Sequence, residues 1–264
     1  MSYSYDLPDA IQVESDGGIR IIRLNRPDDL NAANEELHTA MAHVFEQVDE
    51  DPDARVAVVT GNGRAFSAGG DFEYLHQMSY DQQARLDMFV DAKAIVTSMV
   101  ACRVPIVAAV NGPAVGLGCS LVALSDIVYI AESAFLADPH VLVGLVAADG
   151  GAITWPLLTS LQLAKEYAFT GDRISAERAA QIGLANHVVP DGEALNEALK
   201  MAQRLLKVPH QALLDTKRAM NMHLERAVLN VLDYALVTEE RSFTSDDTRA
   251  FLDKNMAKKD KSKR

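Results

Sequence analysis

The chain has 264 residues, of which 48% are hydrophobic, and its 25 basic and 37 acidic residues give a formal net charge of −12. A chain of this length buries enough apolar surface to fold without disulfides or metal ions. The acidic balance disfavours a polyanionic partner, so we expect no nucleic-acid binding. The two cysteines, Cys102 and Cys119, lie in apolar stretches, which predicts reduced thiols in a cytoplasmic protein.

We expect no targeting signal at the N-terminus. Residues 1–17 contain acidic side chains but no lysine or arginine, which disfavours a secretory or transit peptide. No run approaches the ~18 uninterrupted apolar residues of a membrane helix, so we expect no membrane partner. The basic stretch Lys258–Arg264 predicts a disordered, solvated tail.

The first part of the chain alternates strands and helices. Alternating apolar residues predict a strand over 18–24, and a helical period over 37–48 predicts a helix with Asn34 as its N-cap. The next expected elements are strands over 55–60, 106–110 and 127–131, and a helix over 86–100. This alternation predicts an α/β fold, in which ligands bind near the ends of strands.

Helices dominate after about residue 160, apart from a strand expected over 186–189. A serine cap and a terminal glycine predict a helix over 175–183. The remaining predicted helices are 193–206, 211–221, 226–240 and 244–255. We therefore expect an α/β core over residues 1–190, a helical C-terminal part over 191–257, and the tail over 258–264.

Two glycine-rich turns each follow a predicted strand: Ala65–Asp71 and Asn111–Ser120. Glycine accepts positive φ and has no side chain to block the approach of a ligand. Two such turns brought together can direct two backbone N–H groups at one oxygen, which is how an oxyanion hole is built. The turns therefore predict a site that stabilises negative charge on a carbonyl oxygen.

Further stretches accompany these turns in a characteristic order: Leu24–Pro27, Ser125–Ile127, Val143–Gly151, Thr170–Asp172 and Ala179–Val189. Together they closely resemble the enoyl-CoA hydratase/isomerase (crotonase) superfamily, from about residue 11 to residue 255. The resemblance implies a crotonase-like spiral of ββα units whose C-terminal helices mediate trimerisation. It thus implies a homotrimer or a dimer of trimers.

The same resemblance implies an acyl-CoA thioester substrate, with coenzyme A as part of the substrate and no separately bound cofactor. It places the two oxyanion donors at the amides of Ala68 and Leu117. Residues implied in binding the substrate or its CoA portion are Ala68, Gly69, Gly70, Asp71 and Arg26. The acidic pair Asp28 and Asp29 stands where relatives commonly carry a basic residue, which is unfavourable for CoA phosphates.

The acid/base residues depart from the family pattern. Where hydratases of the family carry two glutamates, this chain has Ser120 and His140. Serine does not exchange a proton near neutral pH, so Ser120 is a candidate for positioning a water or a carbonyl. An imidazole titrates near ~6.5, which makes His140 the candidate proton carrier, with Asp149 as its orienting carboxylate. An acid of the C-terminal helices, such as Glu239 or Glu240, is the fallback.

Three functions remain open on this evidence. The first is a hydratase/isomerase-type enzyme that stabilises the enolate of an acyl-CoA thioester. The second is a β-diketone hydrolase, because the spacing of His140 and Asp149 resembles the 6-oxocamphor hydrolase branch, which cleaves a carbon–carbon bond. The third is a catalytically silent acyl-CoA-binding protein. No metal site is expected, because no cysteine cluster or His-Glu-x-x-His motif occurs.

Overall fold

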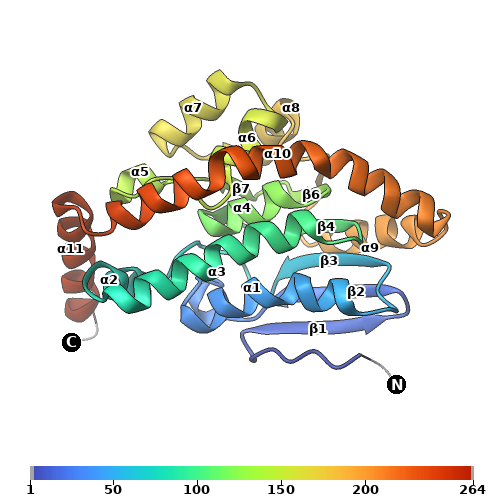
Figure 1. Cartoon of the computed structure of the whole chain (residues 1–264), viewed down its shortest axis with the longest axis horizontal. Helices are drawn as coiled ribbons and strands as arrows, with labels where there is room; N and C mark the ends of the chain where they lie inside the picture. Colours follow the sequence, from blue (N-terminus) through green and yellow to red (C-terminus); the bar gives the residue numbers. More distant parts are fainter. Residues whose placement is uncertain (1–2, 263–264) are drawn as a thin grey trace.

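The computed structural model describes residues 3–262 (Figure 1). Its nine described strands form a six-stranded sheet, in the order β1-β2-β3-β4-β6-β9, and a three-stranded sheet, β5-β7-β8. The strands are β1 Ile11–Asp16, β2 Ile19–Leu24, β3 Val56–Gly61, β4 Ile106–Val110, β5 Ala114–Val115, β6 Ile127–Ala131, β7 Phe135–Ala137, β8 Ile174–Ser175 and β9 His187–Val189. In the large sheet β1 and β2 are antiparallel, and all other neighbours are parallel.

Helices connect and cover these strands. They are α1 Glu35–Glu50, α2 Phe72–Tyr80, α3 Gln82–Ala101, α4 Leu117–Leu124, α5 His140–Val143, α6 Gly151–Leu158, α7 Leu161–Thr170, α8 Ala176–Ile182, α9 Ala194–Leu205, α10 His210–Ser242 and α11 Asp246–Ser262, with a short 3₁₀ helix at Pro27–Asp29. Figure 1 shows α10 crossing the molecule beside α3, with α11 near α2 at its far end. The fold is thus α/β with C-terminal helices, as predicted.

Alternate residues of the central strands supply two cores. Val59 and Ala108 face the larger core, which α1, α3 and α10 also enter. Val58 and Val107 face the opposite side of the sheet and pack on the alanines of α9. Because neighbouring residues of a strand point to opposite faces, a strand buried on both faces is apolar throughout. That explains the continuous apolar run of β4.

The capping residues predicted from the sequence do cap the start of two helices. Asn34 caps α1 by accepting a hydrogen bond from the Leu37 N–H, and Ser175 caps α8 in the same way. The two helices expected over 211–221 and 226–240 form the single helix α10, because residues 222–225 include no glycine or proline to end it. None of the described helices is long and apolar enough to cross a membrane. The trimer stays a prediction.

The basic C-terminal stretch differs from its expectation as a disordered tail. Helix α11 continues through Ser262, so most of the stretch is helical in the structure, while residues 263–264 lie outside the described part of the chain. Lysine is a good helix former, and no glycine or proline interrupts residues 256–262. Charge alone therefore did not end the helix.

Candidate active site

The two glycine-rich turns meet in the structure. They follow β3 and β4, which are parallel neighbours, so their carboxyl ends open at the same edge of the sheet. The Val115 N–H donates to the Ser67 carbonyl at 2.9 Å. Gly69 and Gly116 both have positive φ, and a Cβ on Gly69 would lie 2.9 Å from the Val115 oxygen. Glycine at position 69 is what allows the two backbones this close approach.

Where the two turns meet, the backbone N–H groups of Ala68 and Gly70 differ in whether they have a hydrogen-bond acceptor. The Ala68 N–H donates to the Leu30 carbonyl at 3.0 Å, so Ala68 is not available as an oxyanion donor, contrary to the expectation. The Ala33 N–H donates to the Gly69 carbonyl, and the Ala33 carbonyl accepts from the Asp71 N–H. Because both bonds to Ala33 come from the neighbours of Gly70, the Gly70 N–H points away from Ala33. That N–H has no acceptor within residues 3–262.

Leu117 supplies the second unpaired amide. It is the first residue of α4, where an N–H group has no acceptor within the helix, and the preceding Gly116 has no side chain to cap it. Its N–H likewise finds no acceptor in the described part of the chain. Gly70 and Leu117 line one cavity of about 120 Å³. The candidate pair of donors is therefore Gly70 and Leu117.

Apolar side chains form much of the wall of this cavity: Phe72, Leu75, Met88, Val143, Leu145 and Phe243. Its polar lining includes His140, Asp149 and Glu239, with His38 and Tyr74 contributed by α1 and α2. Among the described residues, no lysine or arginine lines it. The cavity thus combines an apolar wall, two unpaired amides and a group of titratable side chains.

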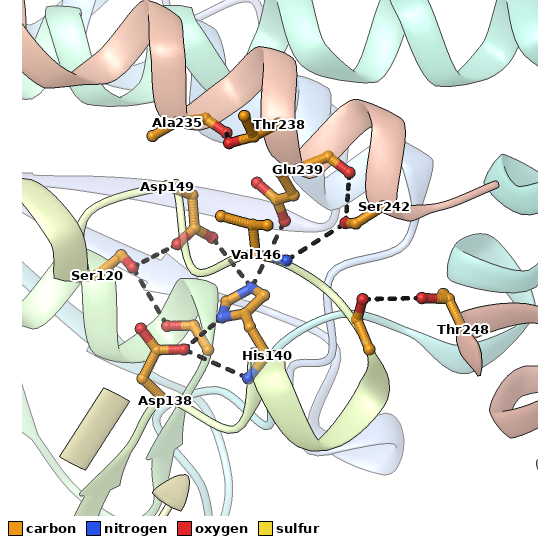
Figure 2. Close-up of polar contacts among 12 residues, drawn as sticks. Ser120, Asp138, His140, Val146, Asp149, Ala235, Thr238, Glu239, Ser242 and Thr248 are labelled. Atoms are coloured by element: carbon orange, nitrogen blue, oxygen red, sulfur yellow. Dashed lines mark hydrogen bonds and ion pairs between the residues drawn. The ribbon is translucent and has the colours of Figure 1, made fainter. Parts of the chain in front are cut away.

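His140 begins α5, separated from the end of β7 by two residues, and its Nδ1 contacts the carboxylate of Asp138 (Figure 2). Asp138 is 2% exposed. A carboxylate at Nδ1 fixes the imidazole orientation, keeps a proton on that nitrogen and stabilises the imidazolium. The orienting role expected for Asp149 therefore falls to Asp138, a residue that our sequence analysis missed although it stands only two positions before His140.

The other ring nitrogen faces two further carboxyl groups. His140 Nε2 lies 4.0 Å from Asp149 Oδ2 and 3.8 Å from Glu239 Oε1. Figure 2 shows the ring between Asp138 on one side and these two acids on the other. The Ser120 hydroxyl donates to Asp149 Oδ1 at 2.8 Å. Ser120 thus holds Asp149 in place, and both distances at Nε2 exceed a direct hydrogen bond.

The loop that carries Asp149 packs closely at Gly150 and Gly151 and is hydrogen-bonded to α10. A Cβ on Gly150 would lie 2.6 Å from the Ser120 Cβ, and one on Gly151 would lie 2.5 Å from Asp138 Oδ2. Three residues before Asp149 in the same loop, the Val146 N–H donates to the Ser242 hydroxyl of α10 at 3.3 Å. The small residues after Asp149 therefore let this loop close against both Ser120 and Asp138.

Burial and charge shift the pKa values in this cluster. Burial disfavours the His140 cation, but the charges of Asp138 and Asp149 outweigh it and raise the His140 pKa well above its usual value. Burial also raises the pKa of Asp149, and it raises that of Glu239 to about 8, with help from the neighbouring aspartates. At neutral pH, His140 and Glu239 therefore hold protons, while the Ser120 hydroxyl stabilises the ionised form of Asp149.

Arg26, expected to meet the substrate, is engaged elsewhere. Its guanidinium donates to Asp29 Oδ2 at 2.6 Å and lies 3.8 Å from Asp71 Oδ2. Asp71 in turn caps α2 by accepting from the N–H groups of Glu73 and Tyr74. Neither Arg26 nor Asp71 lines the cavity, because both are used to hold the turn that carries Gly70. Gly69 and Gly70 do line it, as expected.

Comparison with known proteins agrees with this architecture. The family model described as enoyl-CoA hydratase/isomerase matches residues 14–261. The chain belongs to the enoyl-CoA hydratase/isomerase family. A probable enoyl-CoA hydratase of Mycobacterium bovis is 29% identical over 250 residues, which is 93% of this chain and 96% of the relative.

Solved structures of family members are also similar. An enoyl-CoA hydratase/isomerase from Mycobacterium paratuberculosis has 60% identity and a TM-score of 0.93, and the match covers 95% of this chain and all of that one. A β-diketone hydrolase from the cyanobacterium Anabaena, bound to (S)-3-oxocyclohexyl acetic acid, has 27% identity and a TM-score of 0.83, with 89% and 94% of the two chains covered. Both chemistries considered from the sequence therefore occur among proteins of similar structure.

Glu239 is the remaining acid of the cluster. The sequence identifies it only as one of two fallback acids, because nothing in the residue pattern of α10 distinguishes Glu239 from Glu240. The structure separates them: Glu239 lines the cavity, whereas Glu240 accepts a hydrogen bond from Arg85 at 2.7 Å. Successive helical residues point about 100° apart, so only one of the pair can face the site.

Proposed function

We propose that this family member is an enzyme that stabilises the enolate of an acyl-CoA thioester. The observation that carries the proposal is that two unpaired backbone amides, at Gly70 and Leu117, line the same cavity as His140. The carbonyl oxygen of a thioester gains negative charge when its α-carbon is deprotonated or its β-carbon is attacked. Two preorganised N–H donors would stabilise that charge, at roughly 3–4 kcal/mol per donor.

The proton transfers are assigned to the cluster around His140. In this proposal the Asp149 carboxylate, held by Ser120, accepts a proton from the substrate or from an attacking water. His140 Nε2 returns a proton to the substrate carbon, and Asp138 keeps the ring oriented while it does so. Glu239, whose pKa is about 8, is a second proton source beside Nε2. An acid and a base positioned together contribute about 10²–10⁴ each.

A β-diketone hydrolase is the second candidate. It is favoured by the absence of lysine and arginine from the described cavity lining and by the pairing of Arg26 with two carboxylates. The similarity to the Anabaena enzyme supports it as well. In this reaction water would attack one carbonyl, the carbon–carbon bond would break, and the same two amides would stabilise the enolate that leaves before its carbon is protonated.

One comparison separates the candidates. Calorimetry with a CoA thioester and with the matching pantetheine thioester measures whether the nucleotide portion is recognised, and the proposal expects tighter binding of the CoA form. Equal affinity would favour the diketone reaction, which is then assayed directly by acid release from a cyclic 1,3-diketone. Tight binding of crotonyl-CoA with no loss of its enone absorbance, and no turnover of other thioesters, would instead indicate a silent binding protein.

A further inference from the structure

Two polar side chains outside the His140 cluster line the same cavity. They are His38 on α1 and Tyr74 on α2, whose ring centroids are 6.2 Å apart. His38 is 6% exposed and Tyr74 is 8% exposed. Apolar residues such as Leu75 and Met88 line the same cavity. The pair therefore adds polar groups to the cavity wall beyond those of the His140 cluster.

Within the described part of the chain, neither side chain forms a hydrogen bond. The Nδ1 atom of His38 is buried and forms no hydrogen bond with any described residue. The Tyr74 hydroxyl also forms none with a described residue, but unlike His38 Nδ1 it is not fully enclosed by protein atoms. Leaving a buried donor or acceptor unpaired costs free energy, and most such groups in folded proteins are paired. The enclosed His38 Nδ1 carries this cost, whereas His38 Nε2 and the Tyr74 hydroxyl are the polar atoms of the pair that an occupant of the cavity can reach.

The electrostatics select the kind of partner. Burial lowers the pKa of His38 to about 4, so its imidazole is neutral and offers one donor and one acceptor. Burial, together with the charges of Glu35, Asp91 and Asp87, raises the pKa of Tyr74, so its hydroxyl stays protonated. Those nearby carboxylates also disfavour an anion at this spot. Two neutral groups in a negative field suit an uncharged oxygen.

We propose that His38 and Tyr74 form a second polar subsite, which binds an uncharged oxygen of the substrate, a ketone or a hydroxyl, in addition to the oxygen held by Gly70 and Leu117. The inference rests on the proposed function in one respect, namely that this cavity holds the substrate. It narrows the substrate to molecules with two oxygen functions. A simple saturated or enoyl chain would leave both side chains unpaired.

The test is a binding comparison with two matched pairs of probes. One pair is 5-oxohexanoyl-CoA and hexanoyl-CoA, and the other is cyclohexane-1,3-dione and cyclohexanone. The wild-type protein is expected to bind the doubly oxygenated member at least about tenfold more tightly, as one or two net hydrogen bonds provide. In the variants His38→Leu and Tyr74→Phe that preference should fall to about twofold or less, while affinity for the singly oxygenated member is kept.

Met88→Leu is the matched control, since it reshapes the same wall without changing a hydrogen bond, and it should keep the preference. Thermal unfolding provides a second readout. Removing an unpaired buried group should leave the Tm of His38→Leu unchanged or raised, whereas a structural role would lower it.

Equal binding of both members of every pair by the wild type, or a preference that survives in both variants, would overturn the subsite. If only the diketone pair binds and shows the preference, the acyl-CoA proposal fails and the subsite stands. If no probe binds, the cavity is not the substrate site, and both proposals fail.

Discussion

His140 Nε2 lies 3.8 Å from the carboxyl group of Glu239, although the two residues are 99 positions apart in the chain (239 − 140). The contact places a carboxyl with a pKa of about 8 beside an imidazole whose own pKa is raised. Strongly perturbed titratable groups cluster at functional sites, so a cavity that holds several of them is a candidate site. The cluster around His140 is accordingly the first target for mutation.

His140→Gln is expected to reduce turnover by ~10²–10⁴, because the amide cannot carry a proton. Asp138→Asn should cause a loss of similar order, since an amide in place of the carboxylate neither stabilises the imidazolium nor enforces the same tautomer. Ser120→Ala should cost less, because it only frees Asp149. Steady-state kinetics on the natural substrate measures all three, with circular dichroism as the check on folding. Full activity in Asp138→Asn would remove its orienting role.

Leu117→Pro tests the oxyanion donor directly. Proline is well tolerated at the first position of a helix, which is where Leu117 lies in α4, so the change removes the N–H with little cost to the helix. Turnover should fall by about 10²–10³, the usual effect of losing one such donor. Leu117→Ala keeps the N–H and is the control. Equal activity of the two variants would show that this amide does not act in the reaction.

Glu239→Gln should change how stability depends on pH. The folded protein keeps a proton on Glu239 up to a pKa of about 8, whereas the unfolded chain releases it near 4.5. The contribution of Glu239 to the free energy of unfolding therefore falls as pH rises between these values. The variant stays neutral, so relative to wild type it should gain stability from pH 5 to pH 8.

Urea unfolding at several pH values measures this gain. The exposed residue Glu36 provides the control variant Glu36→Gln, for which a flat difference is expected. A flat difference for Glu239→Gln as well would mean that the carboxyl ionises normally in the folded protein.

Comparing Gly69→Ala with Gly17→Ala distinguishes the cost of crowding between the two glycine-rich turns from the cost of a positive φ in a residue with a side chain. Both glycines have positive φ, but a Cβ at position 17 meets nothing within 4 Å, whereas one at position 69 lies 2.9 Å from the Val115 oxygen. Gly17→Ala should cost about 1–2 kcal/mol in the free energy of unfolding, from conformation alone. Gly69→Ala should cost more and also reduce turnover, because it displaces the Gly70 amide. Equal stability losses would contradict the close packing of the two turns.

Much of this protein follows from short-range patterns in the sequence. The caps at Asn34 and Ser175, the central strands and the two glycine turns were all predictable, because each depends on residues only a few positions apart. His140 was also identifiable, since it stands in a motif whose residue type alone suggests proton transfer. Hydrophobic period and backbone preference carry this information.

Only the tertiary structure decided which groups act together. Because the Ala68 N–H is bonded to Leu30, Gly70 supplies the unpaired amide by which this turn lines the cavity. The approach of Asp138 to Nδ1 leaves Asp149 at Nε2, and the crossing of α10 adds Glu239 there. The direction of an N–H group or a carboxylate depends on how distant elements pack against each other. Spacing along the chain does not record that packing, so it determined the candidate residues but not their partners.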